Sequence, residues 1–240
     1  MNTDVESIHE VGPGAAQKLR ECQGGAVKAY DQTTTAQARN EMLKSALERA
    51  SLAANALLQM TGADFTATGP SDTFRGYIDT VSASLAEAAE HRGLMHEPIT
   101  DSSNDINTMK DDLEGSKTNL NEEIGGDGAP PFIANALENV ARAVAARENA
   151  HTPLSSAKGE VANLAGPITT AQGHADSLLT GGASVQGAAQ EILSAVMPAR
   201  DTADRLAGCL AGAVMPLDEL KGLLSDYDTT QPLEQFSAAV

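Results

Sequence analysis

The sequence of 240 residues predicts an all-α protein, with long helices punctuated by Pro and Gly in one or two antiparallel helical bundles and with a partial internal repeat. Three observations support this prediction. The chain holds 41 Ala and only 3% aromatic residues, so its apolar side chains are small and favour helices. Apolar residues recur at three-, four- and seven-residue spacing, as on one side of a helix. No series of short alternating strands is present. We therefore expect helices packed closely through Ala-rich faces.

A helix is predicted over Asn40 to Met60, where Leu43, Ala50 and Leu57 stand seven residues apart. This spacing is typical of a heptad seam that packs against another helix. Gly62 is expected to end the helix because Gly favours helix termini.

A weaker helix is predicted upstream, over Ala15 to Tyr30, with an interruption near Gly24 and Gly25. The three Thr residues 33–35 follow as candidate caps for the next helix. We therefore expect the chain to begin with a helical hairpin.

The next helix is expected to begin at Ser71 or Asp72, and Pro98 is expected to interrupt it. Beyond this Pro a second heptad seam is predicted, because apolar residues again recur every seven positions. Its members are Ile99, Ile106, Leu113 and Leu120.

The segment GGDGAPP, residues 125–131, is the clearest linker in the chain because Gly and Pro favour turns. It predicts an N-terminal bundle half over residues 1–124 and a C-terminal bundle half over residues 132–228. Residues 229–240 are expected to form a flexible tail.

An internal repeat relates Tyr77–Met109 to Phe132–Leu164 at a constant offset of 55 residues. The pairs with the most information are Arg92 with Arg147, His96 with His151, Pro98 with Pro153, and Ile106 with Val161. We interpret the repeat as a duplicated helix-Pro-helix unit. A shorter echo, Ala-Val-Met-Pro, occurs at 195–198 and again at 213–216, where each Pro favours a kink or a new helix start.

The net charge of −17 disfavours binding to nucleic acid and to anionic membranes, which both require a basic surface. Cys22 and Cys209 stand too far apart in the sequence for a CxxC motif or a zinc ribbon, and a single disulfide between them stays open. The first ten residues lack the pattern of a signal peptide. The longest apolar run, Leu206–Leu217, is too short for a membrane span. We expect a cytoplasmic protein. Export by a route that needs no signal peptide stays an open alternative.

No motif for a catalytic residue, a cofactor or a metal is found, so we expect no enzyme activity. His96 and His151 are the one pair considered for a metal at a helix interface, and a cap or dipole role is the favoured interpretation of a His beside Pro. Carboxylate pairs such as Asp111 and Asp112 are interpreted as a solvated face.

Two resemblances bear on function. Residues Ile8–Leu19 resemble the hairpin of helix-hairpin-helix DNA-binding motifs, but the acidic charge favours a plain helix break at Gly12-Pro13-Gly14. The Ala-rich segments Val140–Leu164 and Ala188–Leu210 resemble Ala-rich helical proteins of actinobacteria and WXG-type modules found beside type VII secretion systems and polymorphic toxins. The chain has no Trp and lacks the Tyr-x-x-x-acid export signal of those modules.

The leading functional hypothesis is a non-enzymatic scaffold or adaptor, which self-associates as a homo-oligomer or binds a helical protein partner. Its candidate interaction seam consists of Leu43, Ala50, Leu57, Ile99, Ile106, Leu113 and Leu120. The competing interpretation is that these residues are buried inside the fold. The alternative function is an acidic chaperone or neutraliser of a basic toxin or enzyme, because an acidic surface attracts basic partners.

Overall fold

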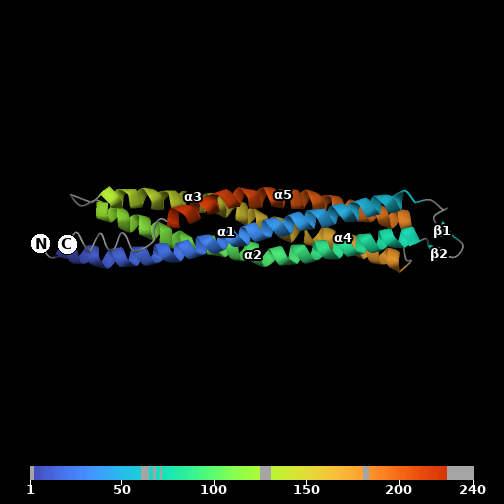
Figure 1. Ribbon diagram of the computed structural model, residues 1–240, viewed down its shortest axis with the longest axis horizontal. Helices are drawn as coiled ribbons and strands as arrows, with labels where there is room; N and C mark the ends of the chain where they lie inside the picture. Colours follow the sequence, from blue (N-terminus) through green and yellow to red (C-terminus); the bar gives the residue numbers. More distant parts are fainter. Residues whose placement is uncertain are drawn as a thin grey trace. The chain divides into compact units, whose positions relative to one another are not determined.

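The computed structural model describes residues 3–60, 65–66, 69–70, 72–124, 131–180 and 184–225, and it describes side chains for 18–60, 72–121, 137–180 and 184–225. Figure 1 labels the elements in chain order: helix α1 (Thr3–Leu58), strands β1 (Phe65–Thr66) and β2 (Gly69–Pro70), and helices α2 (Asp72–Ile124), α3 (Pro131–Asn163), α4 (Ala165–Leu179) and α5 (Val185–Ser225). The two strands form one short antiparallel pair. The prediction of an all-α protein built as a helical bundle is confirmed.

The chain divides into two compact units that each take segments from all the long helices. Unit 1 comprises Met1–Thr34, Thr100–Ser155 and Ala211–Val240, and unit 2 comprises Thr35–Ile99 and Ser156–Leu210. This division differs from the predicted halves 1–124 and 132–228, because helices α1, α2, α3 and α5 each contribute to both units. The predicted linker lies outside the described residues except for Pro131, which begins α3, and the predicted tail lies outside them entirely.

Neighbouring helices within each unit are antiparallel, as the order of their contacts shows. In unit 1, Lys18 of α1 contacts Asp112 of α2, and Lys28 contacts Asp105. The residue number therefore rises along α1 while it falls along α2. The same order relates α3 to α5 in unit 1, where Arg142 contacts Glu219 and Pro153 stands near Gly212. In unit 2 it relates α2 to α3 and α4, where Arg92 contacts Val161 and the Leu85 carbonyl contacts Gln172. Each unit is therefore a four-segment antiparallel bundle with its own core.

The two cores consist almost entirely of Ala, Leu, Ile, Val and Met. The core of unit 2 is centred on fully buried side chains that include Leu43, Leu47, Leu57, Leu85, Met95, Ile99, Leu164, Ile168 and Ile192. The core of unit 1 contains Leu19, Cys22, Ile106, Met109, Leu113, Val140, Leu154, Leu217, Leu220 and Leu224 among others. Burying these faces supplies most of the stability of the long helices, whose intrinsic propensity is a weaker term.

Helix α1 is continuous where two breaks were predicted, at Gly12-Pro13-Gly14 and at Gly24 and Gly25. The expected N-terminal hairpin is therefore wrong. Gly25 has a packing role, because a Cβ atom there would stand 3.3 Å from the Met109 sulfur of α2. A Gly in a helix costs about 1 kcal/mol relative to Ala, a cost that close interhelical packing offsets.

The expected caps at residues 33–35 are also wrong, since all three lie inside α1. Thr33 is fully buried, and its hydroxyl donates to the Ala29 carbonyl at 2.7 Å and lies 2.9 Å from the Ser102 hydroxyl of α2. A hydroxyl that bonds the carbonyl four residues back is satisfied within a helix, so it does not need to end one.

The prolines interrupt the helices less than expected. Helix α2 continues through Pro98 and α3 through Pro153, and α5 spans Pro198 and Pro216. Each internal Pro removes one backbone hydrogen bond, yet buried side chains on both sides, such as Met95 and Ile99 around Pro98, hold the helix together.

Helices α3 and α4 are divided at Leu164, whose backbone keeps right-handed helical angles (φ −68°, ψ −23°). Pro167 has no N–H to donate to the Asn163 carbonyl four residues earlier. The helical hydrogen bonds continue at the next residue, where the Ile168 N–H donates to the Leu164 carbonyl at 3.3 Å.

Ile106 provides a test of the unit 1 core. We expect Ile106→Ala to lower the free energy of unfolding by about 2 to 5 kcal/mol, because it leaves a cavity among fully buried side chains. Urea denaturation followed by circular dichroism measures this change. The control is Met215→Ala at an exposed position of the same unit, which we expect to change stability by less than about 0.5 kcal/mol. Equal effects of the two variants would contradict the assigned core.

Candidate functional site

The predicted interaction seam lies inside the two cores. Leu43, Ala50, Leu57 and Ile99 are at most 1% exposed and belong to the core of unit 2. Ile106 and Leu113 are equally buried in unit 1, where Leu120 is half-buried against the core. The second seam is thus shared between the two units. A partner helix cannot reach the six fully buried side chains while the bundles are folded, so the competing interpretation of the seam describes those six in this structure.

The two histidines related by the repeat do not form a site in either unit. His96 is exposed on α2 in unit 2, and His151 is half-buried on α3 in unit 1. His91 is buried beside Glu87, with 3.7 Å between the His Nε2 and the carboxylate oxygen. Among the side chains that the structure describes, no three His, Cys, Asp or Glu residues are grouped as metal ligands would be.

The acidic pair Asp111 and Asp112 is divided between two roles. Asp112 is half-buried beside α1 and forms an ion pair with Lys18 at 3.7 Å, whereas Asp111 is exposed. The pair therefore lacks the shared environment of a dyad for acid-base catalysis.

Ion pairs join neighbouring helices at the surface within each unit. In unit 1 they are Lys18–Asp112 and Lys28–Asp105 between α1 and α2, and Arg142–Glu219 between α3 and α5. In unit 2 they are Arg49–Glu87, Lys44–Asp204 and Arg205–Glu160. The paired carboxylates raise the pKa of Lys44, through its hydrogen bond to Asp204, and of Arg205, through its hydrogen bond to Glu160. These pairs occupy basic side chains of a chain that has only 16 of them.

The repeat places two arginines in equivalent contacts. In unit 2 the Arg92 Nε of α2 donates to the Val161 carbonyl of α3 at 3.2 Å. In unit 1 the Arg147 Nε of α3 donates to the Ile106 carbonyl of α2 at 2.8 Å. Ile106 and Val161 are themselves related by the repeat, so the two copies exchange donor and acceptor. The repeat was found in the sequence, but the partner of each Arg was not predictable from it.

Arg147 is the more deeply buried of the two arginines. It is 4% exposed, and its Nη2 also donates to the Asn107 side-chain oxygen of α2 at 3.1 Å. A buried guanidinium is costly unless its N–H groups are bonded, so this group determines where α2 and α3 meet in unit 1.

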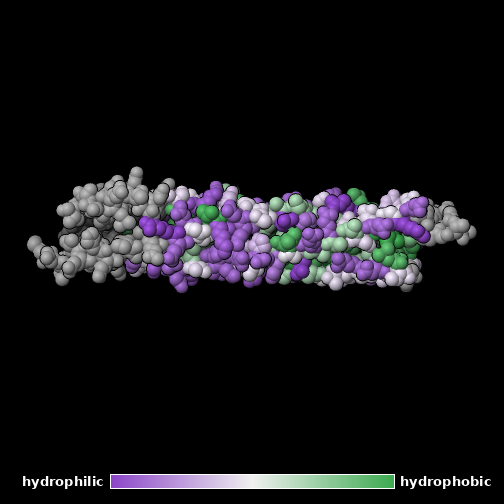
Figure 2. Space-filling view, turned by 60° about the horizontal axis from the view of Figure 1, so that its bottom comes forward, coloured by the Kyte–Doolittle hydropathy of each residue, from purple (hydrophilic) through white to green (hydrophobic). Residues whose placement is uncertain are grey.

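The described surface combines hydrophilic residues with scattered apolar residues, as one face of the molecule shows in Figure 2. Among the described residues, the large apolar side chains that are exposed are Val27, Met42, Leu52, Leu94, Leu179, Met197 and Met215. Both methionines of the Ala-Val-Met-Pro echo are among them. These residues fall outside the heptad seams, so the periodicity of the sequence does not mark them.

Both thiols are free. Burial raises the pKa of Cys22 from 9.0 to about 12, with smaller contributions from Asp112 and Glu21. Burial and the nearby Glu160 also raise the pKa of Cys209, which is half-buried. Neither environment activates a thiolate, which is the nucleophilic form of cysteine.

No family model matches the chain, and the comparisons with curated proteins and with solved structures give no match. Within the described residues, no helix has both the length and the apolar character needed to cross a bilayer.

Arg147→Lys tests the buried guanidinium. Lys keeps the charge but has one nitrogen in place of the two that reach the Ile106 carbonyl and the Asn107 oxygen, so we expect a loss of about 1 to 3 kcal/mol in the free energy of unfolding. The measurement is urea denaturation. Arg142→Lys on the same helix is the matched control, because its ion pair with Glu219 is exposed and contributes about 1 kcal/mol or less. Equal losses in both variants would argue against a special role for Arg147.

Alkylation tests the environment of Cys22, with Cys209→Ala as the background. A pKa raised from 9.0 to about 12 lowers the thiolate fraction at pH 8 roughly a thousandfold, so iodoacetamide should react with folded protein far more slowly than with protein in guanidinium chloride. The folded state holds this proton more tightly, so the stability contributed by the thiol is complete below pH 9 and declines as the pH rises toward 12. Equal alkylation rates in the folded and unfolded protein would refute this prediction.

Proposed function

We propose that the chain is a non-enzymatic helical adaptor, which binds a basic protein partner on its outer surface. The observation that carries this proposal is the use of its few basic side chains. Ion pairs between helices occupy many of them, while exposed carboxylates such as Glu48, Glu90 and Glu97 have no ion-pair partner among the described residues.

The burial of the heptad seams also favours an outer binding surface. Self-association through Leu43 or Ile106 would require the bundles to open, which would expose the apolar cores to water. A partner that docks on the surface leaves both cores intact. The surface charge then selects the partner, because a net charge of −17 accelerates encounter with basic proteins and repels acidic ones.

The alternative of an acidic chaperone or neutraliser is a special case of the same binding mode. The electrostatic argument is identical, and only the consequence of binding for the partner differs. The partner is basic and binds the acidic outer surface in both cases, and the identity of the partner decides what binding does to it.

An affinity capture experiment tests this function. The tagged chain is incubated with lysate of the organism that encodes it, at about 50 mM and about 500 mM salt, because screening shortens electrostatic attraction as salt rises. We expect one dominant basic protein, retained at low salt and released at high salt, and mass spectrometry identifies it. An unrelated helical protein of similar net charge is the control bait.

Two results would contradict the proposal. A partner that stays bound equally at both salt concentrations would exclude an electrostatic basis for recognition. Recovery of the chain alone, together with a multimeric mass by light scattering, would favour a self-assembling structural role.

A further inference from the structure

One face of unit 2 is formed by two parallel stripes of residues, one on α1 and one on α2. Both stripes follow three-, four- and three-residue spacing, which keeps their members on one side of each helix. The α1 stripe is Met42, Ser45, Arg49 and Leu52, and the α2 stripe is Glu87, Glu90, Leu94 and Glu97. We call these eight residues the α1–α2 face.

An ion pair sets the register of the α1–α2 face. Arg49 of α1 is bonded to Glu87 of α2, and it also donates to the Ser45 hydroxyl at 3.0 Å. The two helices are antiparallel, so the residue seven positions before Arg49 and the residue seven positions after Glu87 stand at the same height along the bundle. Met42 and Leu94 stand at these positions. They therefore lie level with each other, about two helical turns from the ion pair.

The apolar members of the face are well exposed. Met42 is 48% exposed, Leu94 is 43% exposed, and Leu52 is 64% exposed on the other side of the ion pair. A single exposed Leu needs no explanation. Two apolar side chains at one level of neighbouring helices, with a third on the same stripe, form an anchor for a partner. Met in particular adapts its unbranched side chain to different partner surfaces.

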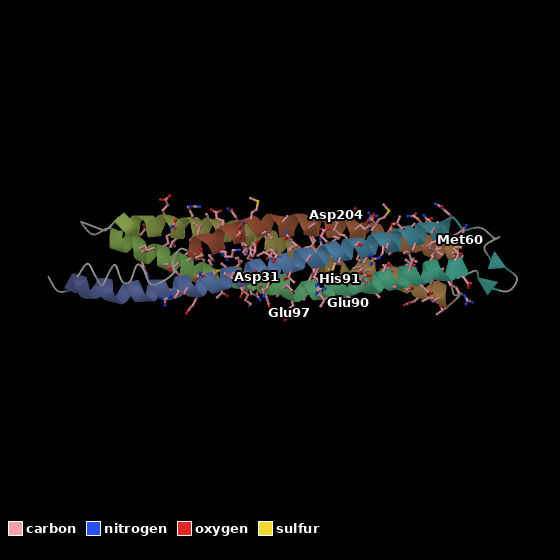
Figure 3. The ribbon with its side chains drawn as sticks, viewed as in Figure 1. Asp31, Met60, Glu90, His91, Glu97 and Asp204 are labelled. Atoms are coloured by element: carbon pink, nitrogen blue, oxygen red, sulfur yellow. The ribbon has the colours of Figure 1, made fainter. Side chains whose placement is uncertain are left out.

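Uncompensated acid surrounds this apolar anchor. Glu90 and Glu97 stand four residues before and three residues after Leu94, and both are exposed on α2, where Figure 3 labels them. Neither has an ion-pair partner among the described side chains. Arg49, the basic member of the face, is already neutralised by Glu87. Met42 and Leu94 are therefore flanked along α2 by two carboxylates without ion-pair partners.

We propose that the α1–α2 face of unit 2 is the docking site for a basic amphipathic helix of the partner protein. An apolar residue of that helix would pack on Met42 and Leu94, while Lys or Arg residues one turn to either side would pair with Glu90 and Glu97. Such a helix presents apolar positions at three- and four-residue spacing with basic flanks, which complements the two stripes in both spacing and charge. This inference rests on the proposed function, because it assumes that the partner is basic.

The test uses a designed probe, a fluorescently labelled 14-residue peptide of Leu and Lys with the Leu residues on one side of the helix. Fluorescence anisotropy at about 100 mM salt measures its binding to the whole chain. Two double variants alter the face at exposed positions, Glu90→Gln with Glu97→Gln, and Met42→Gln with Leu94→Gln. We expect each to weaken binding about tenfold, the effect of losing about 1.4 kcal/mol.

Matched controls change the same chemistry elsewhere on the chain. Asp111→Asn with Glu138→Gln removes two exposed acids of unit 1, and Met197→Gln with Met215→Gln removes two exposed methionines of α5. We expect each to change binding less than twofold. Circular dichroism confirms that every variant keeps its helicity, and a scrambled Leu and Lys peptide of equal charge should bind more weakly than the amphipathic one.

The outcomes separate this inference from the function on which it rests. Absence of binding by the Leu and Lys peptide overturns the docking site, as does equal weakening by the face and control variants, which would indicate general electrostatic attraction. If a basic partner is captured from lysate but binds the face variants as well as the unaltered chain, the proposed function stands and the docking site is wrong. If no basic partner is captured, the proposed function itself fails.

Discussion

The small size of the core side chains is the constraint on which the rest of this structure depends. With 41 Ala and few aromatic residues, the chain has little volume to place between helices, so the helices of each unit must approach closely to exclude water. Close approach explains why glycines are tolerated inside long helices, as Gly25 against Met109 illustrates. It also explains why the helices are long, because each turn buries little apolar area and many turns are needed.

A core of small, similar side chains specifies register weakly, since sliding one Ala-rich face along another changes few contacts. Polar contacts supply what the core lacks. Asn40 donates to the Ala203 carbonyl at 3.0 Å in unit 2, and the Arg147 guanidinium bonds the Ile106 carbonyl in unit 1. A slip of one turn would leave these buried groups without partners, at a cost greater than the gain from any alternative apolar contact. The ion pairs at the helix borders act in the same direction, each with a smaller effect.

The sequence predicted the class of the fold and the positions of its core better than it predicted helix ends or function. Heptad spacing selected Leu43, Leu57, Ile106 and Leu113, which are all buried. The expected breaks at Gly24, Gly25 and Pro98 were wrong because burial of a continuous apolar face outweighs a local propensity of a few kcal/mol. Periodicity also could not distinguish a face buried within the fold from a face left for a partner. The α1–α2 face escaped notice because its register depends on the contact between Arg49 and Glu87, which joins residues far apart in the sequence.

The use of charge inside the fold also shapes what the outside can bind. Acidic residues outnumber basic ones by 33 to 16, and each ion pair between helices takes one of each, so the whole excess of acid stays with the unpaired groups. Arg49 illustrates this use of charge: its ion pair with Glu87 joins α1 to α2, while Glu90 and Glu97 have no ion-pair partner among the described side chains. The contact that sets the register of α1 and α2 therefore also places Met42 beside Leu94. The carboxylates near these two side chains stay without an ion-pair partner among the described residues. Under the proposed function, Lys or Arg side chains of the partner would pair with the carboxylates that the chain's own ion pairs leave unmatched.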